Sequence, residues 1–145
     1  LEFRRVLFRS ELKEALVRYA EQLGISEAVK FHGFSSEIHK IMAGSAIYVS
    51  SSDYEGISNS MLEALAIGIP AICTDCPVGG ARMYIRDGEN GYLIPVGDAD
   101  VMADRMLALM EDKKLGESFS KESVKIREEL TDDRIFGMWK ALLVR

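Results

Sequence analysis

The polar loop at residues 51–59 carries hydroxyl, amide and carboxylate groups whose types and spacing could bind a ligand. It reads Ser-Ser-Asp-Tyr-Glu-Gly-Ile-Ser-Asn and lies between an apolar segment and a segment with helical spacing. A helix that begins there offers unpaired backbone amides and the positive end of its dipole, so a phosphate could bind without a lysine. Gly56 lets the backbone approach a ligand closely, and Ser58, Asn59 and Ser60 add small hydrogen-bonding side chains. The loop therefore predicts an anion site.

Two carboxylates flank this predicted anion site. Glu55 precedes it, where a carboxylate is poorly placed to bind phosphate but well placed to accept hydrogen bonds from the hydroxyls of an attached sugar. Glu63 lies about one helical turn deeper, within reach of hydroxyls such as those of a ribose. The alternatives are structural: Glu55 as a solvated loop acid, and Glu63 as the capping-box partner that turns back to the Ser60 amide. Because two glutamates eight residues apart are common by chance, their spacing alone indicates little.

The elements that would position these residues alternate between strand and helix. Residues 46–50 and 71–74 are apolar without clean alternation, which predicts strands in the middle of a sheet covered on both faces. A helix is expected between them over 60–67, stopped by Gly68 and Pro70. Further strands are expected at 29–32 and 92–94, and further helices at 12–23, from Ser35 or Ser36 to about Gly44, from Asp98 to about Met110, at 115–130 and at 132–143.

This order of elements predicts an α/β fold that is Rossmann-like, with three layers (α/β/α) around a parallel sheet. In such folds ligands bind beyond the carboxyl ends of the strands, where loops run into helix N-termini. The loop at 51–59 follows a predicted strand and precedes a predicted helix, so it would lie at that edge of the sheet.

Composition excludes several classes of function. The chain of 145 residues has a net charge of -5 and a pI near 5.1, which argues against a nucleic-acid partner because phosphates require a basic face. No apolar run is long enough to span a membrane or to form a signal peptide, so a cytoplasmic location is expected. Cys73 and Cys76 would need two further ligands, from His32 and His39, to hold zinc. We therefore interpret the cysteines as a reduced, buried pair and expect no metal.

Residues 1–10 differ in composition from the sequence that follows them. They read Leu-Glu-Phe-Arg-Arg-Val-Leu-Phe-Arg-Ser, which is basic and aromatic, whereas an acidic, helix-patterned segment begins at Glu11. We interpret residues 1–10 as a non-native or junction segment outside the fold. Residues 11–145 would then form one partial domain.

A specific family resemblance lies in residues 52–70, which read Ser-Asp-Tyr-Glu-Gly-Ile-Ser-Asn-Ser-Met-Leu-Glu-Ala-Leu-Ala-Ile-Gly-Ile-Pro. This string resembles the motif of glycosyltransferase family 4, in which two glutamates with seven residues between them open and enter a helix. The wider resemblance runs from about residue 11 to residue 143 and includes residues 29–34, 74–80 and 87–93. It implies a partial C-terminal, nucleotide-sugar-binding domain of a retaining glycosyltransferase with the two-domain GT-B fold.

The same resemblance implies roles for individual residues. Glu55 would be the catalytic residue and contact the donor sugar, while Glu63 would hydrogen-bond the ribose. Arg82 would approach the phosphates, with an ion-paired or solvated arginine as the alternative. The remaining donor-binding positions are the amides of Gly56, Ile57, Ser58, Asn59 and Ser60 at the diphosphate, Gly33 and Phe34 beside the base, and Gly79 and Gly80 in the loop after the second strand.

The implied reaction proceeds with retention at the anomeric carbon, without a metal or cofactor, because the nucleotide sugar is the substrate. Preorganised amides and positive side chains would stabilise the leaving nucleoside diphosphate. One departure from the family pattern is Met83, which stands where an acid is common, so any hydroxyl contact from that position is lost.

The function implied for the parent protein is transfer of a sugar, expected to come from a UDP-sugar, to a glycan or lipid-linked acceptor in surface polysaccharide synthesis. An N-terminal domain would bind the acceptor, and the parent could associate peripherally with the inner face of the membrane. That domain and the diphosphate-binding Arg and Lys of the family are absent from this sequence, so we expect the fragment to be inactive by itself. The alternatives are a non-catalytic nucleotide-sugar-binding module and a GT-B epimerase or phosphorylase.

Overall fold

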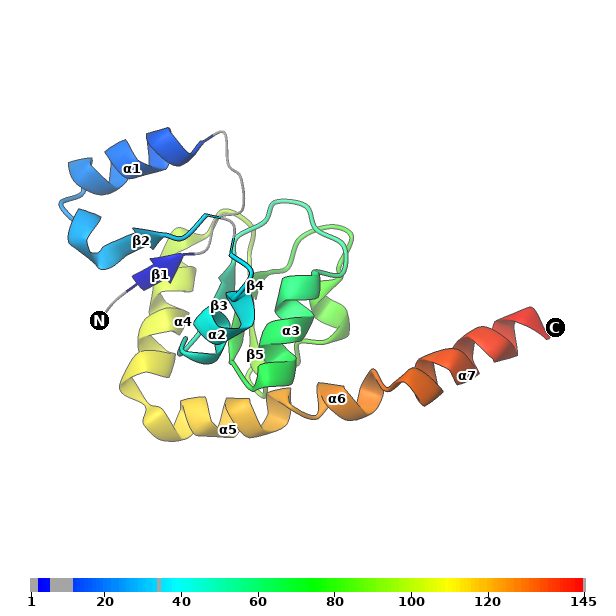
Figure 1. The fold of residues 1–145 in the computed structure, drawn as a ribbon. Coiled ribbons are helices and arrows are strands. Elements are labelled where there is room, and N and C mark those ends of the chain that lie inside the picture. Colours follow the sequence, from blue (N-terminus) through cyan, green and yellow to red (C-terminus); the bar gives the residue numbers. More distant parts are fainter. Residues whose placement is uncertain (1–2, 6–11, 34, 145) are drawn as a thin grey trace. The chain divides into compact units, whose positions relative to one another are not determined.

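The computed structural model describes residues 3–5, 12–33 and 35–144, with the backbone alone for 3–5. The chain divides into two compact units, Leu1–Ile41 and Met42–Arg145 (Figure 1). Phe34, predicted to border the base, lies outside the described residues, as does most of the predicted junction segment at 1–10.

The first unit is built around two parallel strands. Strand β1 (Phe3–Arg5) pairs with β2 (Val29–Phe31), and Phe3 lies opposite Val29. Between them come helix α1 (Lys13–Gln22) and the short 3-10 helix η1 (Ser26–Ala28). The predicted helix at 12–23 and strand at 29–32 are confirmed. The backbone of Phe3–Arg5 forms a strand although the segment was predicted to lie outside the fold. Helix α2 (Ile38–Ala43) crosses the boundary between the two units, where a brief helix was expected.

The second unit contains a parallel sheet in the order β3-β4-β5. Strand β4 (Ala71–Thr74) lies in the centre, and all four of its residues are buried, as predicted. Strand β3 (Tyr48–Ser50) lies at an edge of this sheet, so its predicted central position is wrong there, and Val49 is 36% exposed. The third strand is β5 (Gly91–Ile94).

Different helices pack against the two faces of the sheet at β4, and this arrangement gives the unit its three layers. Successive strand residues point to opposite faces, so Ala71 and Cys73 join one apolar cluster and Ile72 joins another. The first cluster includes Met61 of α3 (Asn59–Ile67), and the second includes Phe119 of α5 (Lys113–Ser123). Figure 1 shows α3 on one side of this sheet and α4 (Ala99–Glu111) on the other. The predicted three-layer α/β/α fold with a parallel sheet is confirmed.

The C-terminal helices differ from expectation at one place. Helices α4 (Ala99–Glu111) and α7 (Asp132–Leu143) match the predicted ranges, and Asp98 caps α4 by accepting from the Val101 amide at 3.0 Å. The single helix predicted over 115–130 is two helices, α5 (Lys113–Ser123) and α6 (Ile126–Glu129). The break allows α6 to pack on α3, where Ile126 joins the α3 cluster and Arg127 Nε donates to Ala66 O at 2.6 Å.

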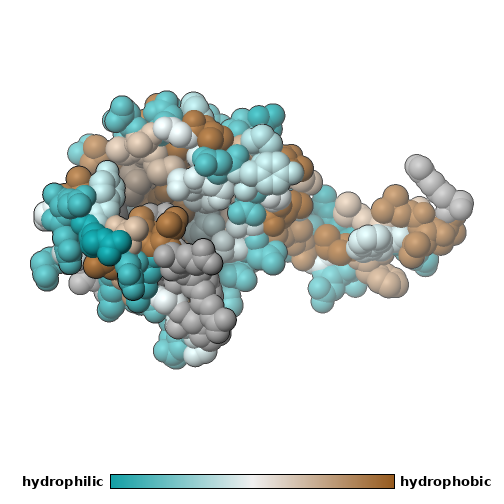
Figure 2. Space-filling model, turned by 90° about the horizontal axis from the view of Figure 1, so that it is seen from above, coloured by the Kyte–Doolittle hydropathy of each residue, from teal (hydrophilic) through white to brown (hydrophobic). Residues whose placement is uncertain are grey.

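Helix α7 leaves large apolar side chains exposed, and apolar residues gather along it in Figure 2. Phe136 is 71% and Trp139 is 61% exposed. Within the described ranges, no helix combines the length and the apolar character that crossing a membrane requires.

Candidate functional site

A small pocket lies at the carboxyl ends of β3 and β4, beside the N-terminus of α3. This is the edge of a parallel sheet at which ligands of such folds bind. Three predicted site residues, Glu55, Gly56 and Ser58, line it together. The full lining is Ser50, Ser52, Glu55, Gly56, Ser58, Met61, Cys73, Thr74, Cys76 and Ala81.

The carboxylate of Glu55 is exposed at this pocket. The hydroxyl of Ser52 donates to Glu55 Oε2 at 3.5 Å, which is a long hydrogen bond. The Glu55 backbone is held more firmly, because its amide donates to Pro77 O at 2.8 Å and its carbonyl accepts from the Val78 amide at 3.2 Å. The side chain can therefore accept hydrogen bonds from a ligand while its backbone stays fixed.

Helix α3 begins with its amides open to the loop. Ser58 is the N-cap residue, and its side chain makes no capping hydrogen bond. Ser60 lies in the first turn and exchanges hydrogen bonds with Tyr48 Oη at 2.8 Å and Ser58 Oγ at 3.0 Å. A capping box between Ser60 and Glu63 would require Ser60 to be the N-cap residue. Because Ser58 is the N-cap residue instead, Glu63 does not form the capping box that was considered as its structural role. Glu63 lies one turn into α3 and is half-buried, apart from the lining of the pocket.

Arg82 is paired with a carboxylate that sequence reasoning missed. It lies in the 3-10 helix η2 (Ala81–Met83), and its Nε and Nη2 each donate to an oxygen of Asp75 at 2.6 Å. This hydrogen bonding and the arginine charge hold the pKa of Asp75 below its ordinary value. The ion-paired alternative is therefore the one observed, and the predicted phosphate contact of Arg82 would require release from Asp75. The only signal in the sequence was an acid in the same glycine-containing loop.

The Asp75–Arg82 pair predicts a pH-dependent difference in stability. Because the folded-state pKa of Asp75 is lowered, the pair contributes stability above the ordinary pKa of 3.8 and loses it as the pH falls through the folded-state pKa. An Asp75→Asn variant should therefore melt at a slightly lower temperature than the wild type at pH 7, and the difference should vanish in strong acid. Both side chains reach solvent, so we expect a shift of at most a few degrees. Thermal unfolding from pH 7 to pH 2 tests this, and a gap independent of pH would contradict it.

Cys73 and Cys76 are buried in the wall of the pocket. Burial, and then the neighbouring Cys76, raise the pKa of the Cys73 thiol to about 12. A protonated thiol is a poor metal ligand and a poor nucleophile. The interpretation of the cysteines as a reduced, buried pair fits this arrangement.

The buried thiol of Cys73 should resist modification in the folded chain. A pKa of about 12 in place of 9.0 lowers its thiolate fraction near pH 8 about a thousandfold, and exclusion of the reagent slows the reaction further. A Cys76→Ser variant isolates this thiol. Its reaction with a colorimetric disulfide reagent at pH 8 should be slow in buffer and fast in concentrated urea. Equal rates in the two conditions would contradict the burial of Cys73.

Three glycines that were predicted to border the donor lie in different units of the chain: Gly33 in the first, and Gly79 and Gly80 in the second. Gly33 follows β2 in the first unit with a φ of 64°, a left-handed conformation that suits glycine. Its proximity to a base stays a prediction. In the second unit, Gly79 also has a positive φ, of 87°, whereas Gly80 packs directly against the backbone of Gly56. Neither Gly79 nor Gly80 lines the pocket.

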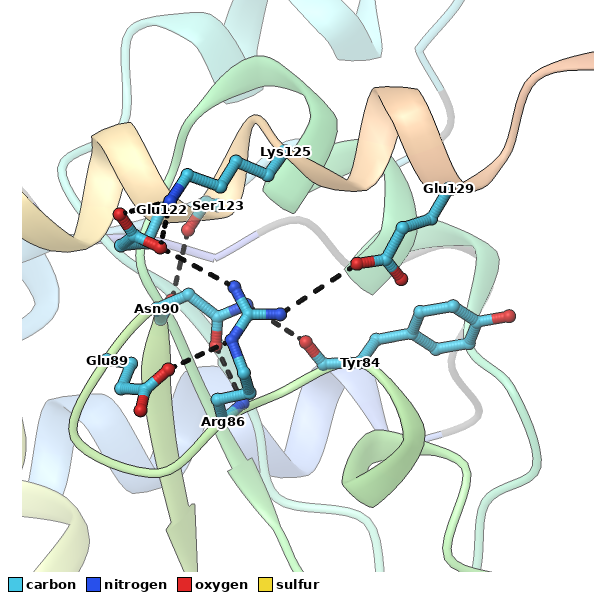
Figure 3. Close-up of polar contacts among 8 residues, drawn as sticks. All are labelled: Tyr84, Arg86, Glu89, Asn90, Glu122, Ser123, Lys125 and Glu129. Atoms are coloured by element: carbon cyan, nitrogen blue, oxygen red, sulfur yellow. Dashed lines mark hydrogen bonds and ion pairs between the residues drawn. The ribbon is translucent and has the colours of Figure 1, made fainter.

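A hydrogen-bond network anchors the segment between η2 and β5 (Figure 3). Asn90 is 2% exposed; its Oδ1 accepts from the Arg86 amide at 2.8 Å and its Nδ2 donates to Tyr84 O at 2.9 Å. The buried hydroxyl of Ser123 donates to Asn90 O at 3.0 Å. Around this centre, Arg86 Nε lies 3.0 Å from Glu89. The network ties the chain that leaves the Arg82 segment to helix α5.

Comparison with known proteins shows which family the chain resembles. Residues 9–125 match the family model "Glycosyl transferases group 1". The Bacillus subtilis protein EpsD, which carries the name of a glycosyltransferase, is 35% identical over 96% of this chain and 38% of its own length. N-acetylgalactosamine-N,N'-diacetylbacillosaminyl-diphospho-undecaprenol 4-alpha-N-acetylgalactosaminyltransferase of Campylobacter jejuni is 32% identical over 88% of this chain and 34% of its own length.

A solved structure shows the same fold. A variant of S. aureus TarM, in complex with fondaparinux, alpha-GlcNAc-glycerol and UDP, superposes with a TM-score of 0.89 at 28% identity, over 98% of this chain and 29% of that one. The chain thus spans little more than a third of the length of the curated relatives described above. Because the family model matches most of the chain, the chain belongs to the glycosyl transferases group 1 family.

Proposed function

We propose that this chain forms the donor-binding part of a retaining, family 4 glycosyltransferase that takes its sugar from a UDP-sugar. The observation that carries this proposal is the pocket in which Glu55, Gly56 and Ser58 meet beside the uncapped N-terminus of α3. The helix-end amides suit the diphosphate, since they offer donors and a positive dipole end. The exposed carboxylate of Glu55 suits the hydroxyls of the sugar. The UDP in the TarM complex supports the choice of base.

Individual contacts follow from this orientation of the donor. The amides from Gly56 to Ser60 would receive the diphosphate, Glu63 would bind the ribose, and the Gly33-Phe34 turn would border the base. The loop of Gly79 and Gly80 would close the site from the β4 side, and Arg82 would add charge when it leaves Asp75. Amides already fixed in place stabilise the leaving diphosphate without a metal, so the reaction needs neither a metal nor a cofactor.

We further propose that the complete protein delivers the sugar to a glycan or lipid-linked acceptor in surface polysaccharide synthesis, in the cytoplasm at the inner face of the membrane. The name of the Campylobacter relative, which specifies a diphospho-undecaprenol acceptor, supports this class. The chain covers 38% of EpsD, so the acceptor site would be supplied by the part of the protein outside this chain. By itself the 145-residue chain would bind donor weakly and not turn over.

Transfer of radiolabelled sugar by the complete protein tests this function. UDP-sugars should label a membrane-derived lipid or glycan fraction, with release of UDP and with unchanged rates in excess EDTA. The anomeric configuration of the product, read by NMR, should match that of the donor. Conversion of the free UDP-sugar without label in an acceptor would indicate an epimerase, and dependence on inorganic phosphate would indicate a phosphorylase.

A non-catalytic nucleotide-sugar-binding module is the second candidate. The observation that favours it is the bidentate pairing of Arg82 with Asp75, which leaves neutralisation of the diphosphate mainly to helix-end amides. Calorimetry with UDP and UDP-sugars separates the two candidates when combined with the transfer assay. Binding without transfer by the complete protein would favour the module, and transfer excludes it.

A further inference from the structure

The loop at 74–80, which follows β4, touches the Glu55 loop mainly through backbone atoms. Both loops leave neighbouring parallel strands at their carboxyl ends, because Ser50 of β3 lies opposite Cys73 of β4. The Glu55 amide donates to Pro77 O at 2.8 Å, and the Val78 amide donates back to Glu55 O at 3.2 Å. This reciprocal pair forms an isolated parallel bridge between Glu55 and Val78. It fixes both backbone polar groups of the residue that carries the exposed carboxylate.

A third hydrogen bond between the two loops lies nearer the strands. The hydroxyl of Thr74, the last residue of β4, donates to Ser52 O at 2.5 Å. Thr74 is 3% exposed and Ser52 is half-buried, so this hydrogen bond is partly shielded from water. A carbonyl with little access to water that loses such a donor is left poorly satisfied, which is costly. The start of the Glu55 loop is therefore held by β4 as well.

Gly80 completes the contact by allowing the two backbones to approach. A Cβ atom on Gly80 would lie 1.9 Å from Gly56 O and 2.6 Å from the Ile57 amide nitrogen, so the backbone of one loop would have to move. Gly80 has a φ of -62°, which any residue adopts, so the need for glycine here is one of space. Its role in the fold is thus to admit the Glu55 loop.

We propose that the 74–80 loop is a template that positions Glu55, with Thr74 and Gly80 as its positioning residues. The proposal rests on the proposed function for its kinetic consequence, but its structural content is independent of that function. Three hydrogen bonds and one close backbone contact constrain a loop whose acidic side chain has only a long hydrogen bond to Ser52. Precise placement matters because a displacement of about 1 Å at a reacting centre can lower a rate about a hundredfold.

Amide hydrogen exchange in the 145-residue chain tests the template directly. In Gly80→Ala and in Thr74→Val, the amides of Glu55 and Val78 should exchange at least about tenfold faster than in the wild type. Thr74→Ser retains the hydroxyl and should restore slow exchange. The matched control is Gly91→Ala, whose Cβ would lie 2.4 Å from Ala71 O at the opposite end of β4. It should destabilise the chain without selective loss at Glu55 and Val78.

Kinetics of the complete protein supply the second readout. Thr74→Val should lower kcat for sugar transfer about tenfold to a hundredfold with a smaller change in KM for the UDP-sugar, and Thr74→Ser should recover the rate. If the Glu55 and Val78 amides exchange selectively faster in these variants but the complete protein transfers no sugar, the template proposal stands and the proposed function is overturned. The template proposal would be overturned if, at equal global stability, the Glu55 and Val78 amides exchanged no faster in Thr74→Val or Gly80→Ala than in Gly91→Ala. If Gly80→Ala does not fold, Thr74→Val decides alone.

Discussion

Replacement of Glu55 by alanine or glutamine in the complete protein is expected to lower kcat for sugar transfer about a hundredfold to a thousandfold. The carboxylate is exposed at the pocket, and within the described part of the chain its one side-chain hydrogen bond is the long one from Ser52. It can therefore accept hydrogen bonds from the donor sugar, and such a contact stabilises the transition state when it strengthens as charge develops there. Steady-state rates of transfer from a UDP-sugar measure the effect.

The expected pattern separates catalysis from folding and from nucleotide binding. Glu55→Gln keeps the shape of the side chain, and the affinity for UDP, measured by calorimetry, should change little because the nucleotide lies beyond the sugar. Glu117→Gln is the matched control, since Glu117 is an exposed glutamate of α5 in a long ion pair with Lys113. Glu117→Gln should transfer at the wild-type rate. Near-normal transfer by Glu55→Ala would remove its assigned role.

The two glutamates of the motif should differ in their kinetic signatures. Glu63 lies within α3 and outside the pocket lining, and the proposed function assigns it to the ribose and not to the reacting carbon. Its replacement would then weaken binding of UDP itself and raise KM, because that contact is equally strong in the ground state and the transition state. The carboxylate of Glu55 would act mainly on kcat.

The parts of the fold encoded in local sequence could be predicted. The order of strands and helices follows from the hydrophobic period, and the start of α4 follows from Asp98, whose side chain caps it as expected. The pocket could also be located, because a polar loop between a strand and a helix must lie at the carboxyl edge of a parallel sheet. Local spacing therefore predicted where Glu55, Gly56 and Ser58 would meet.

Contacts between distant segments could not be predicted in this way. The salt bridge of Arg82 with Asp75 depends on how a loop folds back, and the packing of Gly80 on Gly56 depends on two loops leaving adjacent strands. The break between α5 and α6 is similar, because it is set by the packing of Ile126 against α3 and not by a glycine or proline at the break. Periodicity within one segment carries no information on these pairings.

The same limitation applies to Asn90, which the sequence marked only as part of a turn. Asn90→Ala is expected to lower the free energy of unfolding by about 3 kcal/mol. Its side-chain amide joins the Arg86 amide to Tyr84 O, and Asn90 itself is 2% exposed. Alanine would leave a part-buried donor and a part-buried acceptor without these partners, which costs more than the loss of an exposed hydrogen bond. Urea unfolding of the 145-residue chain measures the change.

Three further variants grade this prediction by burial. Ser123→Ala removes one buried hydroxyl and leaves Asn90 O with one donor fewer, so its loss should be about 1 kcal/mol. Asn90→Asp keeps the acceptor for the Arg86 amide but cannot donate to Tyr84 O, so it should remain well below the wild type at pH 7. Glu89→Ala breaks only an exposed ion pair with Arg86 and should be nearly neutral. If Asn90→Ala were no less stable than Glu89→Ala, the stability of this segment would come from its surface charges. If Asn90→Ala is the most destabilising of these variants, the stability of the segment comes mainly from the buried amide of Asn90. That amide holds the chain between η2 and β5, and so it also supports η2, which carries Arg82.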